Sequence, residues 1–162
     1  MGSIQNWNGK LYVPDAMLRA HDEARAALVR ATMEGGRITK AAKRVAELCL
    51  PHFEHEEESV FPVLALLTYL AQGNLRPEMM DVMPLIFSFR AKHDALNDHH
   101  QLIVSAIEGL LQAAHTEKNR EFAEFAYNLR VHERIEDEVI YPTVILIGKY
   151  LQEKLANLSP IS

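Results

Sequence analysis

Apolar residues recur three and four positions apart along most of the chain, which is the spacing of one face of an α-helix. The pattern predicts four long helices, which begin near Pro14, Thr39, Pro77 and Thr116. Gly35, Gly36 and Gly73 fit the turns after the first two helices. No stretch of the sequence alternates polar and apolar residues as a half-buried strand does. Four long helices with short loops predict an all-α fold, an up-down-up-down antiparallel four-helix bundle.

Prolines and glycines set the expected limits of these helices. Four prolines fall within the long helical segments: Pro51, Pro62, Pro84 and Pro142. Each should kink or restart its helix, because proline lacks the backbone N–H. The third helix is expected to stop near Gly109, with a longer loop after it. Residues 1–12 are expected to form an N-terminal arm, and residues 13–158 the helical bundle.

Composition narrows the class of protein. The chain has 162 residues, of which 48% are hydrophobic and 24% charged, enough for one soluble domain with a sizeable core. A net charge of −5 disfavours a sequence-independent grip on nucleic acid. The longest apolar runs are too short to span a bilayer, no secretory signal is visible, and Cys49 is the single cysteine, so a cytoplasmic location is expected. Eight histidines are many for this length and need an explanation.

An eleven-residue motif occurs twice, 80 residues apart, at residues 52–62 and 132–142. Each copy has a histidine, a glutamate four residues later, a second acidic residue, an aliphatic–aromatic pair and a proline. Residues four apart lie on the same face of a helix. His52 with Glu56, and His132 with Glu136, therefore form two pairs of neighbouring side chains of types that bind metals.

Counting residues from the predicted turns places further histidines at the level of this motif. In antiparallel helices, residues equally distant from the connecting turn lie at the same height. The first turn matches His21 with His52, and the second matches Glu56 with His93. These four residues are therefore expected within about one turn of the same level. Across the third connection, His93 and His132 lie at the same height only if the third helix stops near Gly109, with a longer loop after it, or extends beyond the start of the fourth helix.

Four imidazoles and two carboxylates are the predicted metal ligands: His21, His52, Glu56, His93, His132 and Glu136. Such a set, without thiolate, suits iron, manganese or zinc. It is too large for one tetrahedral zinc ion and fits two ions, each with two histidines, that share the glutamate pair. Two divalent ions exceed the charge of two carboxylates, which invites a bridging hydroxide or oxide and an open coordination position. Such a centre can bind or reduce dioxygen, peroxide or nitric oxide.

These residues resemble the hemerythrin-like (HHE cation-binding) family. The matching features are His21, His93, a His-Phe-x-x-Glu-Glu segment before Phe-Pro, and a His-x-x-x-Glu segment before Tyr-Pro. The resemblance covers about residues 14–157, and it implies a four-helix bundle with a non-haem di-iron centre. Members have been linked to oxygen binding, to oxygen or iron sensing, and to the handling of nitric oxide or peroxide.

Two departures from the oxygen-carrying hemerythrins matter. Those proteins show a second histidine one turn after the first in the third helix, where this chain has Asn97. They also use an aspartate one residue later than Glu136. Asparagine is a poor iron ligand, although Asn97 could hydrogen-bond a metal-bound molecule. The departures place the chain with the broader HHE group.

Residues around the motifs have simpler interpretations. His100 shares a face with His93 but lies about two turns, roughly 10 Å, away, so a core or interface role is expected, with an access channel as the alternative. Glu57 and Asp137 are interpreted as part of a solvated face, with orientation of a ligand imidazole as the alternative. Tyr141 is interpreted as a core residue.

Three classes of function remain open. The leading hypothesis is a protein with two iron ions that binds, senses or detoxifies a small diatomic molecule or peroxide. The second is a di-iron or di-manganese enzyme of the oxidase or peroxidase kind. The third is a structural or interaction bundle with a vacant site. The expected partner is the small ligand, without nucleic acid or membrane, and the sequence leaves the oligomeric state open.

Overall fold

The structure is a computed structural model that describes residues 10–156. Throughout that range the secondary structure is helical and contains no strand, which confirms the predicted all-α class. The first nine residues of the expected N-terminal arm and residues 157–162 lie outside the described part. No helix within 10–156 has the length and apolar character needed to cross a membrane.

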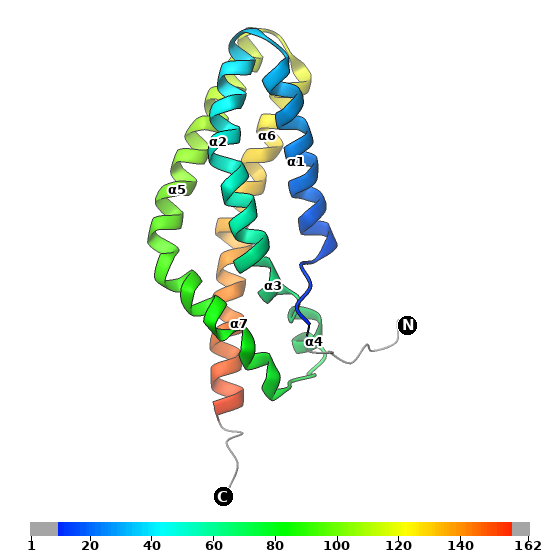
Figure 1. Ribbon diagram of the computed structural model, residues 1–162, viewed down its shortest axis with the longest axis vertical. Helices are drawn as coiled ribbons and strands as arrows, with labels where there is room; N and C mark the ends of the chain where they lie inside the picture. The colour runs from blue at the N-terminus through cyan, green and yellow to red at the C-terminus, as the bar shows by residue number, and fades with distance from the viewer. Residues whose placement is uncertain (1–9, 157–162) are drawn as a thin grey trace, which may run out of the picture.

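Four long helices run side by side in the upper part of Figure 1: α1 (Asp15–Met33), α2 (Gly36–Ser59), α5 (Met83–Thr116) and α6 (Arg120–Ile135). The closest packing joins α1 to α2, α2 to α5 and α5 to α6, while α1 and α6 touch each other less. The lower part contains α3 (Phe61–Leu64), α4 (Leu67–Ala71), the 3₁₀-helix η1 (Pro77–Val82) and α7 (Tyr141–Leu155). A π-helical segment, η2 (Glu136–Ile140), joins α6 to α7.

The turns between α1 and α2 and between α5 and α6 lie together at one end of the molecule (Figure 1). Gly35 has a φ of +105°, which other residues rarely adopt, and it allows the first turn. In the second turn, the Asn119 side chain accepts a hydrogen bond from the backbone N–H of Phe122 and caps α6. The Asn119 amide also donates to Glu34 Oε1 at 2.9 Å, which ties the two turns together.

Three predicted helix limits are wrong. The second helix begins at Gly36, and Thr39 lies inside it, where its hydroxyl accepts a hydrogen bond from the Gly35 N–H. Thr116 ends α5 and does not cap α6. Helix α5 also continues through Gly109, because one interior glycine costs a helix only about 1 kcal/mol and the flanking apolar face is buried.

The prolines act largely as predicted. Pro62 and Pro142 are the second residues of α3 and α7, and Pro84 is the second residue of α5. At these positions the missing N–H is not needed for the helix. Pro51 lies inside α2, which continues past it without a break in the helical assignment.

Two apolar cores fill the molecule. The upper core lies between α1, α2, α5 and α6, and it includes Phe53, Leu110 and Leu129. The lower core surrounds α7 and includes Phe61 and Tyr141. The buried polar residues lie between the upper core and the lower core. This holds along α2 and along the continuous helical segment formed by α6, η2 and α7. The fold therefore places polar side chains inside the molecule with apolar packing on both sides.

Candidate metal centre

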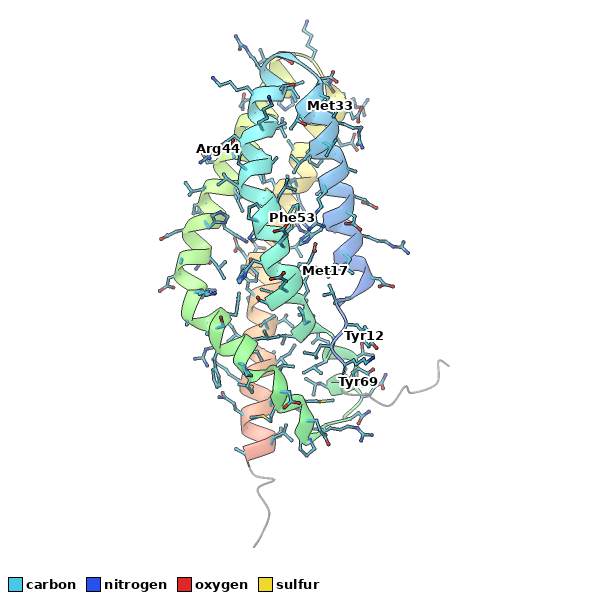
Figure 2. The ribbon with its side chains drawn as sticks, viewed as in Figure 1. Tyr12, Met17, Met33, Arg44, Phe53 and Tyr69 are labelled. Carbon is cyan, nitrogen blue, oxygen red and sulfur yellow. The ribbon has the colours of Figure 1, made fainter. Side chains whose placement is uncertain are left out.

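Polar side chains from five elements meet between the two cores, and together they are named the polar cluster. Its members are His21 of α1, His52 and Glu56 of α2, His100 of α5, His132 and Glu133 of α6, and Glu136 of η2. His132 has a side chain 17% exposed, and every other member is 3% exposed or less. Figure 2 labels Phe53, the neighbour of His52, at mid-height in the molecule. The cluster is thus a buried group of imidazoles and carboxylates.

The two oxygens of Glu136 face different pairs of histidines. Oε1 lies 2.7 Å from Nε2 of His132 and 3.6 Å from Nε2 of His21. Oε2 lies 3.4 Å from Nε2 of His52 and 3.9 Å from Nε2 of His100. Glu136 begins the π-helical segment, and such widened turns are frequent at functional sites. This carboxylate therefore separates the four imidazoles into two pairs.

Two sets of ligand atoms result, each with all of its atoms within 4.8 Å of one another. The His132 group comprises His21, His132 and Glu136, and the His100 group comprises His52, Glu56, His100 and Glu136. Nitrogen and oxygen atoms bound to one ion at about 2.1 Å lie roughly 3.0–3.5 Å apart for bond angles between 90° and the tetrahedral value. The separations around Glu136 are close to that range. These buried groups can hold a metal ion.

Glu56 connects the two groups from the side of α2. Its Oε2 atom lies 3.3 Å from Nε2 of His52 and 3.5 Å from Nε2 of His21. His52 and Glu56 face the same side of α2, as residues four apart in a helix should. Both glutamates of the repeated motif therefore contact imidazoles of both groups.

Several buried atoms of the cluster have no hydrogen-bond partner. They are Nε2 of His21 and of His132, Nδ1 of His52 and of His100, Oε2 of Glu56, Oε1 of Glu136 and both oxygens of Glu133. Nε2 of His132 and Oε1 of Glu136 are close, but they are not aligned as a hydrogen bond. Unpartnered buried polar atoms are costly, and in native proteins they require an explanation. Lone pairs that converge without donors are the arrangement expected of metal ligands, so the donor set fits a cation.

Carboxylates outside the cluster contact the far nitrogens of two of its imidazoles. Nδ1 of His21 is hydrogen-bonded to Oε1 of Glu57 at 2.8 Å, and Arg25 donates to the same oxygen. Nδ1 of His100 lies 2.8 Å from Oδ1 of Asp137. Such contacts fix the orientation of an imidazole and leave its other nitrogen for a metal. The alternative interpretation of Glu57 and Asp137, as orienting groups, therefore agrees with the structure.

Aromatic residues contact the cluster differently on its two sides. The Phe53 ring stacks on His21 with centroids 4.1 Å apart, and the Phe61 ring lies 5.0 Å from the same imidazole. On the other side, the Tyr141 hydroxyl donates to Oε1 of Glu56 at 2.8 Å and lies 2.9 Å from Nε2 of His100. Tyr141 is buried in the lower core, as predicted, but its hydroxyl also belongs to the site.

The pKa values of the buried carboxylates are shifted in opposite directions, upward by burial and mutual repulsion at Glu133 and Glu56 and downward by histidine contacts at Glu136. Burial, followed by the charge of Glu136, raises the pKa of Glu133 and of Glu56 well above the ordinary value, although the Tyr141 hydrogen bond opposes the shift of Glu56. Burial also opposes ionisation of Glu136, but contacts with His132, His21 and His52 hold its pKa well below the ordinary value. Without a metal, ionisation is thus favoured at Glu136 and disfavoured at Glu133 and Glu56.

Neighbouring groups respond to the same environment. Burial, and then the proximity of His52, lowers the pKa of His100, so its imidazole favours the neutral form that binds metals. Burial, and then the charges of Glu133 and Glu136, raises the pKa of the Cys49 thiol. Cys49 is fully buried in the upper core and has no disulfide partner.

Five of the six predicted ligands lie in the polar cluster, namely His21, His52, Glu56, His132 and Glu136. His93 does not. Its side chain is 34% exposed, its Nδ1 atom lies 3.8 Å from Asp94 and 3.4 Å from the amide of exposed Asn97, and its ring packs on Phe89. The residue count failed because it assumed straight α-helices. The chain between Glu56 and His93 breaks into α3, α4 and a 3₁₀ segment, whose rise per residue differs.

His100 occupies the place in the cluster that was predicted for His93. A core position was expected for it, and the structure adds contacts of Nε2 with His52 at 3.1 Å and with Glu133 at 3.8 Å. Glu133 was not predicted at all. It follows His132 directly and is fully buried, with Oε2 at 3.8 Å from Nε2 of both His52 and His100. Its counterpart in the first motif copy is buried Phe53, and that correspondence is the sequence signal for an inward position.

Comparisons with models of protein families, with curated proteins and with solved structures found no match to this chain. The functional argument therefore rests on the geometry and chemistry of the polar cluster.

Proposed function

We propose that this chain is a hemerythrin-like four-helix-bundle protein whose polar cluster holds two iron ions. In this proposal the centre binds, senses or detoxifies a small ligand such as dioxygen, nitric oxide or peroxide. Bound iron supplies the affinity for such ligands and the capacity for electron transfer. The chain's own residues hold the ions, orient the imidazoles and exclude bulk water.

The observation that carries the proposal is the position of Glu136 between two pairs of imidazoles. One carboxylate oxygen serves the His132 group and the other serves the His100 group. Glu56 repeats the arrangement with an oxygen near one histidine of each group. A single ion needs only one such group, so two groups that share Glu136, with Glu56 in contact with a histidine of each, support a pair of ions.

Ligand type supports iron over a structural zinc ion. Imidazole and carboxylate without thiolate suit iron, manganese and zinc, and a structural zinc site commonly uses cysteine. The one cysteine, Cys49, is buried in the upper core and belongs to neither ligand group. Manganese and zinc remain as outcomes of the metal analysis.

The test is metal analysis of protein purified from iron-supplemented cells, combined with absorption spectra. The proposal expects about two iron ions per chain and near-ultraviolet bands that change on adding oxygen or azide. One manganese or zinc ion per chain would contradict the di-iron centre. Metal-free protein that remains folded and unchanged on adding iron would instead favour a structural or interaction role with a vacant site.

An enzyme of the oxidase or peroxidase kind is the second candidate. It is favoured by Tyr141, whose buried hydroxyl contacts both Glu56 and His100, and by Glu133, whose raised pKa favours its protonated form beside the same histidine. These two groups can give protons to a bound peroxide or oxygen species. Turnover of peroxide by the iron-loaded protein, lost in Tyr141→Phe while iron content is retained, would support this candidate.

A further inference from the structure

Exposed apolar side chains form a stripe along the continuous helical segment of α6, η2 and α7 (Figure 1). The stripe consists of Tyr127, Val131, Ile135, Val139, Pro142 and Leu146. Its members other than the proline are large apolar residues with exposures between 37% and 65%. The remaining large apolar side chains exposed in residues 10–156 are spread over several elements, with at most two on any one helix. Single exposed apolar residues are ordinary, whereas a contiguous apolar patch marks an interaction site.

The stripe lies on the side of this segment that faces away from the polar cluster. Its members follow one another at steps of three or four residues, and residues so spaced share one face of a helix. At about 100° per residue, buried Glu133 lies roughly 200° around the helix from exposed Val131. The stripe is therefore a second surface of the segment, separate from the face that carries the candidate ligands.

The π-helical turn keeps the stripe straight. A step of four residues exceeds the 3.6 residues of one α-helical turn, so a stripe built of such steps drifts sideways by about 40° at each step. In η2 (Glu136–Ile140) the turn is wider, because a π-helix bonds each residue to the fifth along the chain. Four residues of η2 fall short of a full turn, which returns Val139 toward the line of Tyr127 and Val131. The turn that places Glu136 thus also aligns the apolar side chains on the opposite face.

The stripe has nearly the same pattern when it is followed in either direction from its middle, at residues 136–137. A twofold axis through that middle, perpendicular to the segment, places an antiparallel second copy against it. Each stripe residue of one copy then meets an apolar residue of the other. The pairs are Tyr127 with Leu146, Val131 with Pro142, and Ile135 with Val139.

Charges beside the stripe are complementary in the same arrangement. Arg134 and Glu138 are 68% and 62% exposed, and they pair with each other within the chain at 2.8 Å. Each directly precedes a stripe residue, Ile135 or Val139, so both lie along the same edge. In an antiparallel twofold pair that edge meets the same edge of the second copy, and Arg134 of each copy faces Glu138 of the other. A parallel pair would instead bring Arg134 level with Arg134.

We propose that this stripe is the contact surface between two copies of the chain, packed antiparallel about a twofold axis at residues 136–137. The stripe extends over residues 127–146, about 30 Å of helix. A contact of that length and one helix wide covers less than the roughly 800 Å² per partner of standard interfaces. The pair is therefore expected to separate on dilution. It forms from the chain's own side chains and does not depend on the proposed metal centre.

The first test is the mass of the full chain in solution, measured by sedimentation equilibrium over a wide range of protein concentration. The mass should rise from that of one chain, 18.4 kDa, to twice that value. A single-chain mass at the highest concentration would overturn the proposal. A mass that grows beyond two chains would overturn it too, because a twofold contact closes on itself.

A charge at the centre of the stripe should separate the copies. In Ile135→Glu the twofold axis brings two new carboxylates together in an apolar contact, so the dissociation constant should rise about 10-fold or more. Leu102→Glu is the matched control, because Leu102 is 53% exposed on α5, outside the stripe. It should associate as the wild type does, and circular dichroism checks that both variants remain helical. Equal dissociation constants for the two variants would place the contact elsewhere.

Charge reversal tests the antiparallel register. Arg134→Glu and Glu138→Arg should each weaken the pair, because each sets like charges against one another twice. The double variant, Arg134→Glu with Glu138→Arg, should restore association. The two single variants mixed together should form a mixed pair more tightly than either associates alone, since every contact at this edge is then attractive. Absence of both the rescue and the mixed pair would contradict the proposed arrangement.

Discussion

The two halves of the polar cluster use the same framework to build different surroundings. In each half a motif histidine and a second histidine face a shared glutamate, and an outer carboxylate contacts the second imidazole at 2.8 Å. Around His21, however, the remaining neighbours are the rings of Phe53 and Phe61. Around His100 the equivalent neighbours are Glu133 and the hydroxyl of Tyr141.

The comparison separates two roles for the repeated motif. Positions that match between the copies supply the candidate ligands, and positions that differ set the polarity on each side. One side is lined by the rings of Phe53 and Phe61, and the other carries the Glu133 carboxyl and the Tyr141 hydroxyl, whose pKa values are raised chiefly by burial. The four predictions that follow test whether this difference is real, beginning with the group that both halves share.

Glu136→Ala should have the largest effect, because Glu136 contacts histidines of both halves. We expect the variant to lose both ions, from about two per chain to fewer than one. Metal analysis after purification from iron-supplemented cells measures it. Glu138→Ala is the control, since Glu138 lies in the same π-helical segment but is 62% exposed and pairs with Arg134. Retention of two ions in Glu136→Ala would contradict the proposal that both ions share the Glu136 carboxylate.

Tyr141→Phe should be next in size. The change removes the one hydroxyl that donates to Glu56 Oε1 and leaves that buried oxygen without its donor. We expect the metal-free protein to lose about 1–3 kcal/mol of unfolding free energy, measured by urea denaturation. Tyr127→Phe, at a tyrosine that is 52% exposed, should change it by less than about 0.5 kcal/mol. Equal effects of the two substitutions would mean that the Tyr141 side is no more polar than the Phe61 side.

Glu133→Gln should change the pH dependence of the unfolding free energy more than it changes the magnitude of that free energy. The pKa of Glu133 is raised in the folded chain, so its contribution is fully present below the ordinary value of 4.5 and is lost as pH rises through the folded pKa. Glutamine does not titrate. We therefore expect the stability of the metal-free wild type, relative to Glu133→Gln, to fall as pH increases above 4.5. The measurement is urea denaturation of both proteins across pH. Parallel curves of unfolding free energy against pH for the wild type and Glu133→Gln would contradict a raised pKa at Glu133.

His93→Ala should have the smallest effect. His93 is partly exposed on α5 and contacts Asp94, Asn97 and Phe89 outside the cluster. Iron content should stay at the wild-type value, and the unfolding free energy should change by no more than about 0.5 kcal/mol. His100→Ala on the same helix should lose an ion from the His100 group. Loss of iron in His93→Ala would restore the original assignment of this ligand.

Much of this architecture follows from residue periodicity. The helical class, the helix restarts at Pro62, Pro84 and Pro142, and the approach of His21 to the two motifs were all predicted. These features depend on local rules, namely helix spacing and the missing proline N–H. They hold because each can be evaluated within one helix or across one short turn.

His93 was selected because the count across the second turn assumed unbroken α-helices, and the stop expected at Gly109 kept the third turn from correcting it. With α5 extended to its true end at Thr116, His100 lies 16 residues before that residue and His132 lies 16 residues after it. The same count that matched His21 with His52 then selects His100. Glu133 was missed for a different reason, because the sequence shows a charged residue type but not the buried surroundings that raise its pKa.

Burial of Cys49 gives the chain a built-in reporter. Thiolates, and not thiols, react with alkylating agents, and this sulfur is both inaccessible and held in the protonated form by its surroundings. Because it is the single cysteine of the sequence, modification by iodoacetamide can occur at no other side-chain thiol. The rate of that modification therefore measures how often the helices separate beside the cluster. Bound ions that connect α1, α2, α5 and α6 should lower this rate.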